Sequence, residues 1–509
     1  MKTPLAEEEE AQDRTLWNAD QRLSVLKLYL SPNGASLDEN NNEVNQLANE
    51  QHRQPSSIAL KLRNFRYLDS GAEVTGLKGM SGFSKRDVIC WKRHSGRPLS
   101  SRAVKTIQEK GWNDLLNTES GERIPETPIS RALLSKPFLI LTGPSGTGKT
   151  RGAIQLAKEL HCEADCLAVV AVGADWTDNR HVVGFLNPLQ TADGQPNGIP
   201  IYETTAILNL LLHANEHPEQ PHVLILDEMN LSHVERYFAD FLSAMELEDK
   251  EKALKLHSAG SAKTREGVEV KGCIDFPENL FVIGTVNIDE TTYMFSPKVL
   301  DRANVIEIHA EDTALEAFLK GTAAAGAVEE RNNGISFLDL AQEIRRKEPD
   351  AARVPLLPDA LKNAAADRLM ELFRIMKRGR GEFGFRTGRE VLAYLRTAHF
   401  LTPEADRAAW AAPEGKWLEA LDAQILQKIL PKLHGSRTRL APLLGALATY
   451  CATGMEAYAL EHFPEGGNSP RRGLNDARNI ENPKFPNSYR KLERMIGVLV
   501  EEQFVSFIC

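Results

Sequence analysis

The stretch "GPSGTGKT", residues 143–150, has the residue types and spacing of a phosphate-binding loop. The apolar run "FLILT" precedes it and the helical segment "KTRGAIQLAKEL" begins within it, which is the strand-to-helix context that such a loop requires. Glycines let backbone N–H groups wrap the phosphates of a nucleotide, Lys149 reaches the outer phosphates, and Thr150 can hold Mg²⁺. We therefore predict a nucleotide site formed by Gly143, Pro144, Ser145, Gly146, Thr147, Gly148, Lys149 and Thr150.

An acidic pair follows a second apolar run, "HVLILDE". Asp227 can complete the Mg²⁺ shell together with Thr150, and Glu228 can polarise the water that attacks the terminal phosphate. An Asp-Glu pair after a strand is also an ordinary helix start, because acids are favourable there. The phosphate-binding loop upstream favours the catalytic interpretation.

Polar residues crowd the end of a third apolar run, in "GTVNIDETTYMFSPKVLDRANVIEI", residues 284–308. Asn287 should emerge at the carboxyl edge of a parallel sheet, where an amide can orient the attacking water. Arg302 ends a short helix just before the next strand, a spacing that suits an arginine directed at the nucleotide of a neighbouring subunit. The alternative for Arg302 is a surface cation near a helix C-terminus.

Five apolar β-type runs alternate with helical segments between residues 131 and 310: "PFLILT", "CLAVVAVGA", "HVLILDE", "NLFVIGTVN" and "NVIEI". Near-continuous apolar strands separated by helices predict an α/β fold with a parallel sheet covered on both faces. Within this core, residues 248–278 contain two alternating runs around a Gly/Ser/Lys-rich tip, which predicts a β-hairpin insertion. The hairpin either points towards a pore or partner, or is a solvent-exposed decoration.

The regions that flank this core, 131–310, differ from it in composition. Residues 1–100 are predicted to form a helical domain, 101–130 a polar linker, and 311–509 a helical lid and C-terminal region. In the N-terminal domain, "NEVNQLANEQHR" and "QPSSIALKLRNFRYL" predict a helix, a tight turn and a basic helix, which is the helix-turn-helix pattern. The alternative is a three-helix bundle with a solvated basic face. The candidate DNA contacts are Arg53, Lys61, Arg63 and Arg66.

Composition excludes several classes of protein. Hydrophobic content of 42% and charged content of 26% argue against wholesale disorder, and a net charge of −9 argues against a chain coated in positive charge. The only close cysteine pair, Cys162 and Cys166, lacks further Cys or His at zinc-ligand spacing, so we interpret all six cysteines as reduced thiols in a cytoplasmic protein. No apolar run approaches the roughly 20 residues of a membrane span, so no membrane association is expected.

The order of these elements resembles that of the AAA+ NTPases, and among them the McrB-like motor subunits of modification-dependent restriction systems. The closest local similarity is "LILDEMNLSHVERYFADFLSAME". The resemblance implies a homo-oligomeric, six-membered ring that hydrolyses ATP or GTP with Mg²⁺ and drives a separate McrC-like nuclease subunit. That family has Met-Asn-x-x-Asp after the fourth strand, whereas this chain has Glu290 in place of the aspartate, so the choice between ATP and GTP stays open.

Two further segments carry resemblances. The run "RQPSSIALKLRNFRYLD", with "GLKGMSGFSKRDVICW", is similar to the recognition segment of HNH-type restriction endonucleases, which implies DNA binding; no His-Asn-His array follows it. In "EFGFRTGREVLAYL", the position of Arg386 and Arg389 at the head of a helix is similar to that of the second sensor residue in AAA+ lids. This resemblance implies that one of the two arginines contacts the nucleotide. Two other functions stay open: a MoxR-like chaperone that remodels proteins, and a nucleotide-gated switch with little turnover.

Overall fold

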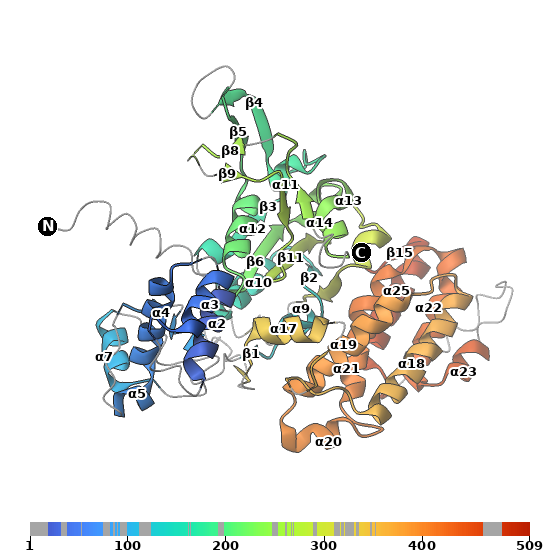
Figure 1. Ribbon diagram of the computed structural model, residues 1–509. Helices are drawn as coiled ribbons and strands as arrows, with labels where there is room; N and C mark the ends of the chain where they lie inside the picture. The colour runs from blue at the N-terminus through green and yellow to red at the C-terminus, as the bar shows by residue number, and fades with distance from the viewer. Residues whose placement is uncertain are drawn as a thin grey trace. The chain divides into compact units, whose positions relative to one another are not determined.

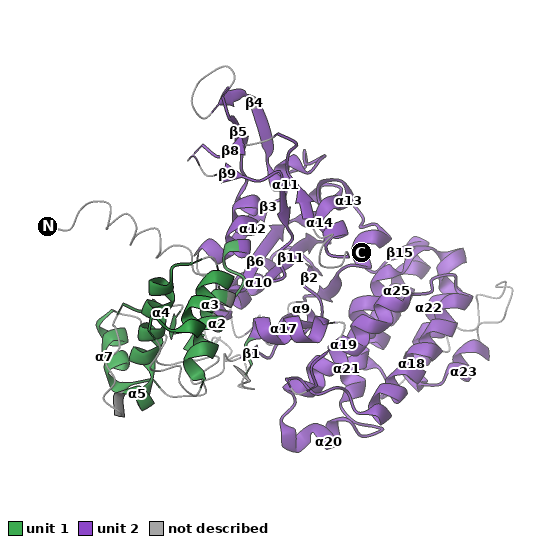
Figure 2. Ribbon diagram, viewed as in Figure 1, with its two compact units in different colours: residues 1–123, 216–219, 332–336 green, residues 124–215, 220–331, 337–509 purple. Residues whose placement is uncertain are grey.

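The computed structural model divides the chain into two compact units (Figure 2). Unit 1 comprises residues 1–123, 216–219 and 332–336, and unit 2 comprises residues 124–215, 220–331 and 337–509. The residues that the structure describes are 19–31, 38–51, 53–74, 82–84, 87–88, 90–91, 99–110, 124–160, 162, 164–191, 198–246, 253–259, 262–265, 267, 269–288, 293–309, 316, 320, 330–331, 335–346, 349–351, 353–461 and 481–508.

Unit 2 is built on a five-stranded parallel sheet with the strand order β12–β2–β11–β6–β3 (Figure 1). The strands are β2 (Phe138–Gly143), β3 (Leu167–Ala171), β6 (His222–Asp227), β11 (Leu280–Asn287) and β12 (Asn304–Glu307). They coincide with the five apolar runs of the sequence, and the predicted parallel α/β sheet is confirmed. The two central strands β2 and β11 are buried along almost their whole length, as expected for strands covered on both faces.

The register of the sheet brings the carboxyl ends of its strands together. Asn287, the last residue of β11, pairs with Gly143, the last residue of β2, and Asp227 at the end of β6 pairs with Ala171 of β3. A Cβ atom at Gly284 of β11 would collide with the sulfur of Met229, so a larger residue there would require the Met229 side chain to move. The polar residues that follow three strands therefore emerge at one edge of the sheet.

Helices on both sides of the sheet complete the nucleotide-binding core: α9 (Pro128–Ser135), α10 (Lys149–Glu159), α12 (Ala206–Glu216), α14 (Ala239–Ala244) and α15 (Pro297–Leu300). A reciprocal capping box between Thr127 and Ser130 fixes the start of α9. Gly148 caps α10 in the left-handed region with a φ of +85°, which a residue with a side chain rarely adopts. The turn that leads into α10 therefore depends on glycine.

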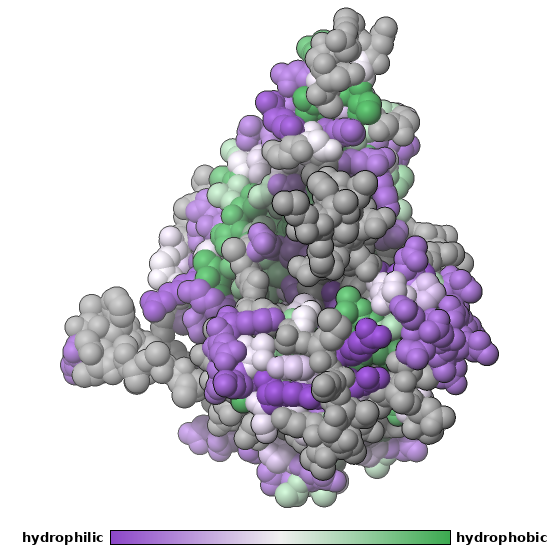
Figure 3. Space-filling model, turned by 60° about the vertical axis from the view of Figure 1, so that its left-hand side comes forward, coloured by the Kyte–Doolittle hydropathy of each residue, from purple (hydrophilic) through white to green (hydrophobic). Residues whose placement is uncertain are grey.

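The predicted insertion at 248–278 contains two antiparallel strand pairs. Strand β7 (Ala253–Lys255) pairs with β10 (Cys273–Asp275), and β8 (Ala262–Lys263) pairs with β9 (Glu269–Val270). Our sequence analysis did not predict their partners, β4 (Phe185–Thr191) and β5 (Pro200–Glu203), which join β8 and β9 in a four-stranded sheet. This arm projects from the core in Figure 1, and Figure 3 shows hydrophobic side chains towards its tip.

Residues beyond the core form the expected helical region. Its main elements are α17 (Phe337–Arg345), α18 (Asp359–Arg378), α19 (Phe385–Leu401), α21 (Trp417–Gln424), α22 (Arg437–Thr453) and α25 (Pro486–Glu502), with a small antiparallel pair of β14 (His434–Ser436) and β15 (Phe504–Ser506). One continuous hydrophobic cluster extends from the sheet into α18, α19, α21, α22 and α25. None of the helices in the described part of the chain is both long enough and apolar enough to cross a membrane.

The shorter elements of unit 2 connect these larger ones. They are β1 (Ile124–Pro125), η2 (Ala164–Cys166), α11 (Arg180–Val183), η3 (Met229–Leu231), α13 (Val234–Tyr237), β13 (Glu330–Arg331), η5 (Glu404–Asp406), α20 (Arg407–Trp410), η6 (Ile425–Ile429), η7 (Leu430–Lys432) and α23 (Glu456–Glu461).

Unit 1 is a helical domain whose elements are α2 (Ala19–Leu30), α3 (Asn42–Glu50), α4 (Pro55–Leu68), α5 (Ser70–Val74) and α7 (Ser101–Glu109). Helix α4 is its centre and buries Ile58, Leu62 and Phe65 in the domain core. The structure moves the predicted domain boundary at residue 100, because α7 adds Ala103 and Ile107 to the same core. The first nine residues of the predicted linker are therefore part of this domain.

Candidate nucleotide-binding site

The phosphate-binding loop connects β2 to α10 at the carboxyl edge of the sheet. It turns through Gly146 and Gly148, both with positive φ, and Lys149 follows at the first position of the helix. The Lys149 ammonium donates hydrogen bonds to the carbonyl oxygens of Gly143 at 2.8 Å and Pro144 at 2.6 Å. Its charge is therefore held within the loop, where it can exchange these carbonyl oxygens for the oxygens of a bound phosphate.

Thr150 and Asp227 come together directly beside this loop. The Thr150 hydroxyl donates a hydrogen bond of 2.6 Å to Asp227 Oδ1, and the Thr285 hydroxyl donates one of 2.7 Å to the same oxygen. A hydroxyl and a carboxylate are hard oxygen ligands of the kind that Mg²⁺ prefers, so this pair fits a nucleotide-bound magnesium ion. The structure brings together the two residues that the sequence analysis assigned to the metal.

Glu228 and Asn287 form the second contact of the site. Asn287 Nδ2 donates a hydrogen bond of 3.1 Å to Glu228 Oε1, although the two residues are far apart in the chain. Glu228 has a φ of +54°, a left-handed conformation that is uncommon for a residue with a side chain. The carboxylate assigned to water activation and the amide assigned to water orientation are thus neighbours.

Thr285 belongs to the site, and our sequence analysis missed it. Its hydroxyl accepts a hydrogen bond of 3.1 Å from the backbone N–H of Glu228 while donating to Asp227. It is almost completely buried, with 2% of its surface exposed. Thr285 could have been predicted from its position two residues before Asn287, because alternate residues of a strand lie on the same face of the sheet.

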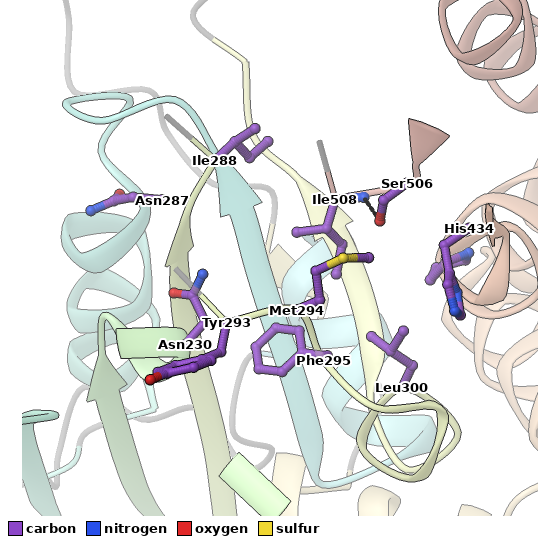
Figure 4. A pocket seen from close by; sticks show the side chains of 11 residues that line it. Asn230, Asn287, Ile288, Tyr293, Met294, Phe295, Leu300, His434, Ser506 and Ile508 are labelled. Carbon is purple, nitrogen blue, oxygen red and sulfur yellow. Dashed lines mark hydrogen bonds between the residues drawn. The ribbon is translucent and has the colours of Figure 1, made fainter. Parts of the chain in front are cut away.

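A small pocket lies next to the end of β11, and Figure 4 shows its lining. Tyr293, Met294 and Phe295 line it together with His434 and Ser506 from the C-terminal region. In the close-up, Asn287 points away from Met294 and Phe295. Of the polar stretch that follows β11, residues 289–292 lie outside the described residues, and with them Glu290, on which the nucleotide choice was left open.

Arg302 lies in the turn between α15 and β12 and is engaged by its own chain. Its guanidinium donates hydrogen bonds to the carbonyl oxygens of Leu242 at 2.9 Å and Lys298 at 2.6 Å, and it forms an ion pair with Glu246. Only 15% of its side chain is exposed. A role at a neighbour's nucleotide would require the guanidinium to leave these partners.

The two arginines of the lid lie in different surroundings. Arg386 forms ion pairs with Glu246 and with Asp301, the latter at 2.9 Å, so it joins Arg302 at Glu246. Burial alone would raise the pKa of Asp301, but the nearby cations, Lys432 foremost, lower it. Arg389 instead is exposed and lines a basic cavity of α17, α18 and α19. The contact of one of these two arginines with the nucleotide stays a prediction.

A second ion cluster joins the lid to the core. Glu390 of α19 forms ion pairs with Lys136, which follows α9, and with Lys428 of η6 at 2.6 Å. The Lys428 ammonium also donates hydrogen bonds of 2.9 Å to the carbonyl oxygens of Asp301 and Ala303, at the start of β12. Burial would raise the pKa of Glu390, but Lys428 and Lys136 lower it. The carboxylate therefore stays ionised, while burial lowers the pKa of Lys136 and lowers that of Lys428 to about 7.

The candidate DNA contacts of unit 1 do not form a solvated basic face. Lys61 is only 8% exposed, and its ammonium bonds both carboxylate oxygens of the buried Asp87, at 3.0 and 3.1 Å. The expectation that Lys61 contacts DNA was therefore wrong, because Lys61 is buried and its charge is paired with Asp87 inside the domain. Arg53 bonds the side chain of Gln21 at 3.1 Å. Arg63 and Arg66 are half-buried, and burial lowers the pKa of Arg66.

Comparison with known proteins identifies one relative of part of the chain. The "Type IV methyl-directed restriction enzyme EcoKMcrB subunit" of Escherichia coli (strain K12) is 27% identical over 196 residues, which is 37% of this chain and 38% of that protein. The chain thus matches well under half of the length of this relative. Residues 336–504 match a family model described as a domain of unknown function (DUF8727).

Two solved structures are similar in part. A protein of Cytophaga hutchinsonii assigned as an ATPase has a TM-score of 0.36 at 13% identity and covers 56% of this chain and 78% of its own. The Hsp104–ADP complex of Saccharomyces cerevisiae has a TM-score of 0.28 at 17% identity and covers 60% of this chain and 54% of its own. At these scores the superpositions carry no argument about function. Over 196 residues the chain is thus a distant homologue of the EcoKMcrB subunit, and its core combines a phosphate-binding loop with a parallel sheet of order β12–β2–β11–β6–β3.

Proposed function

We propose that this chain is a nucleoside triphosphatase that hydrolyses ATP or GTP at the carboxyl edge of the β12–β2–β11–β6–β3 sheet. The observation that carries the proposal is the convergence of Thr150, Asp227, Glu228 and Asn287, from two strands and one helix, beside the phosphate-binding loop. These are the residue types that phosphoryl transfer to water needs, and they are positioned without a substrate.

Each residue has one task in this mechanism. Lys149 and the N–H groups of the loop bind the phosphates, and Thr150 and Asp227 would hold a Mg²⁺ ion, which would neutralise charge on the phosphate oxygens. Asn287 orients a water molecule, and Glu228 Oε1 accepts its proton as the water oxygen bonds to the γ-phosphorus. The bond between the γ-phosphorus and the bridging oxygen breaks, and the nucleoside diphosphate leaves with that oxygen.

Phosphate release from ATP and from GTP, measured with and without Mg²⁺, tests this proposal. We expect Mg²⁺-dependent turnover of at least one nucleotide by the full chain, and loss of nucleotide binding in Lys149→Ala. Lys158→Ala is the matched control, because Lys158 lies on the exposed side of the same helix and should behave as wild type. A wild-type chain that hydrolyses neither nucleotide contradicts the proposal.

We further propose that the active form is a ring, with six subunits as the expected number, in which Arg302 of one subunit neutralises charge at the nucleotide of the next. Two observations support it: the place of Arg302 between α15 and β12, and the 196-residue match to a restriction-enzyme subunit. In the single chain Glu246 and two carbonyl oxygens hold the guanidinium. Assembly would have to offer the arginine a stronger anion than Glu246.

The work of this motor, in our proposal, is to drive a separate McrC-like nuclease on DNA that unit 1 binds. Support comes from the match to a methyl-directed restriction enzyme subunit. With Lys61 in the domain interior, Arg63 and Arg66 become the basic residues of α4 assigned to the phosphate backbone.

Binding of the full chain to methylated and unmethylated duplex DNA over a salt series tests this assignment. We expect binding at low salt that weakens steeply as salt rises, because phosphate contacts release counterions. Arg63→Ala should reduce the steepness, while Lys105→Ala on α7 serves as a control. A chain that binds no duplex at any salt concentration would contradict the DNA assignment and favour protein remodelling as the function of the ring.

A further inference from the structure

Three side chains that are far apart in the sequence converge at the amino-terminal edge of the sheet. They are Cys166 at the end of η2, His213 in α12 and His222 at the start of β6. Cys166 Sγ lies 4.0 Å from His213 Nδ1, and His213 Nδ1 lies 2.8 Å from His222 Nε2. The three ligand atoms all lie within 4.8 Å of one another. Cys166 is 3% exposed and His222 is completely buried.

The hydrogen bonds around His222 fix which of its nitrogens faces the cluster. Asn279 Nδ2 donates to the carbonyl oxygens of Ala214 at 3.1 Å and Gln220 at 2.8 Å, which uses both of its N–H bonds, so we assign no hydrogen bond to its 3.1 Å approach to His222 Nδ1. His222 Nδ1 lies 3.0 Å from the same Gln220 carbonyl oxygen and therefore carries the proton that it donates there. The lone pair is then on Nε2, which points at His213 and Cys166.

This arrangement is the one that metal-binding histidines have in proteins. A ligating imidazole almost always donates its other N–H to a carbonyl or carboxylate oxygen, which sets its tautomer and orientation. The Gln220 carbonyl oxygen has that role here for His222. Asn279 in turn holds this carbonyl in place. The structure thus contains both the ligand atoms and the hydrogen bonds that orient His222 as a metal ligand.

A second thiol contacts the residue next to His222, although it lies outside the set of ligand atoms that are within 4.8 Å of one another. Cys162 Sγ donates a hydrogen bond of 3.4 Å to the carbonyl oxygen of Pro221, the residue immediately before His222. Cys162 also precedes Cys166 by four residues, so one short segment supplies both thiols. Two cysteines and two histidines are a common ligand set of structural zinc sites, and soft thiolates with imidazoles favour Zn²⁺ over Mg²⁺.

We propose that Cys166, His213 and His222 bind one Zn²⁺ ion, with Cys162 as the fourth ligand. With tetrahedral bonds of about 2.0–2.1 Å to nitrogen and 2.3 Å to sulfur, the two nitrogens would stand about 3.3 Å apart and nitrogen and sulfur about 3.5 Å apart. The present separations of 2.8 and 4.0 Å differ from these by about 0.5 Å each, which small side-chain rotations would supply.

The zinc ion would connect three segments of the core. It would join residues 162–166 after α10, helix α12 and the first residue of β6. Asp227 ends the same strand five residues later, roughly 16 Å away at the strand rise per residue. The zinc is therefore separate from the magnesium of the nucleotide site and stabilises the sheet that carries it.

Metal analysis of the full-length chain, with no nucleotide present, tests the proposal independently of hydrolysis. We expect about one zinc per chain after purification from zinc-supplemented cells. After zinc is removed, Co²⁺ should give the visible absorption bands of a tetrahedral site and a thiolate-to-cobalt band in the near ultraviolet. Zinc should raise the midpoint of thermal unfolding of the metal-free chain.

Variants identify the ligands. Cys166→Ser and His213→Gln should lose the stoichiometric metal and the tetrahedral cobalt bands, and Cys162→Ser should lose about half of the thiolate band. Cys273→Ser is the matched control, because Cys273 is an exposed thiol of β10, and it should retain both. Circular dichroism shows that each variant is folded. A wild-type chain without stoichiometric zinc or cobalt bands, or Cys166→Ser with unchanged bands, overturns the site; an unchanged thiolate band in Cys162→Ser overturns the fourth ligand.

Discussion

Glu228 has an uncommon backbone conformation at the point where the proposed chemistry takes place. Its φ of +54° costs on the order of 1 kcal/mol or more for a residue with a side chain, so its surroundings must hold it. They do so from two sides: Thr285 accepts a hydrogen bond from its N–H, and Asn287 donates one to its carboxylate. Two residues of β11 thus fix both the backbone and the side chain of the acid that follows β6.

Thr285 should matter for hydrolysis although it does not touch the substrate. Thr285→Val keeps the shape of the side chain but removes its hydrogen bonds to Asp227 and Glu228. A hydrogen bond to a charged group contributes about 1.5–3 kcal/mol, so we expect kcat to fall by about ten- to a hundredfold. Steady-state phosphate release measures it. Thr285→Ser retains the hydroxyl and should keep most of the activity; equal loss in both variants would show that the methyl packing, and not the hydrogen bonds, is required.

The nucleotide-site residues could be predicted from the sequence to a large extent, because their motif spacing is local. Lys149 and Thr150 lie within one loop, and Asp227 and Glu228 directly follow one strand. What could not be predicted are side chains whose role depends on distant partners. Lys61 reads as a basic helix residue, yet its partner Asp87 lies 26 positions away, and the histidines near Cys166 are still more distant in sequence.

At the scale of elements, the lid is attached to the core by charge as well as by apolar contacts. Glu390 of α19 forms ion pairs with Lys136, beside α9, and with Lys428 of η6. Lys428 also donates hydrogen bonds to the carbonyl oxygens of Asp301 and Ala303, just before β12. Because these groups are mostly buried, their charges are little screened by solvent. The position of the lid helices relative to the sheet therefore depends on this cluster.

Glu390→Gln should destabilise unit 2. The substitution leaves the ammonium groups of Lys136 and Lys428 without their carboxylate in a buried place, a change that typically costs about 3 kcal/mol. Urea unfolding measures the change in free energy of unfolding. Glu382→Gln, an exposed position just before the same helix, is the control and should change it by less than about 0.5 kcal/mol. Equal stability of the two variants would contradict the anchoring role of the cluster.

The core strands could be predicted because each is an apolar run with a helix after it, whereas other elements could not. Strand β4 has Pro188 at its middle and an exposed Leu189, and β5 begins with Pro200, so they lack the continuous apolar pattern of β2 or β11. Strand β4 pairs with β5, and β5 pairs in turn with the distant strand β8. Helix α7 was assigned to a linker because only two of its residues, Ala103 and Ile107, face the core.

At the scale of the whole molecule, the proposed ring requires that one chain completes the nucleotide site of another. The nucleotide site of a single chain contains Thr150, Asp227, Glu228 and Asn287, but Arg302 is held by Glu246. A ring would bring a cation from the neighbour to each site, which makes hydrolysis depend on assembly.

Mixing two inactive variants tests this dependence. Arg302→Ala removes the cation that a subunit lends, and Glu228→Gln removes the acid that it uses, so each variant alone should be inactive. In mixed rings an intact Glu228 can meet an intact Arg302 of the neighbour, and hydrolysis should partly return. Arg236→Ala, an exposed arginine of α13, is the control for Arg302→Ala. Full activity of Arg302→Ala alone, or no recovery on mixing, would contradict a shared site.

The most direct test of the central claim compares nucleotide binding with hydrolysis in Glu228→Gln, using Mg²⁺ with ATP and with GTP. The account predicts that the variant binds nucleotide as tightly as wild type while phosphate release falls by a hundredfold or more, since a general base typically contributes that much. Glu404→Gln, an exposed glutamate of η5, should hydrolyse nucleotide as wild type does. Hydrolysis by Glu228→Gln at the wild-type rate would contradict the assignment of this site as the place of catalysis.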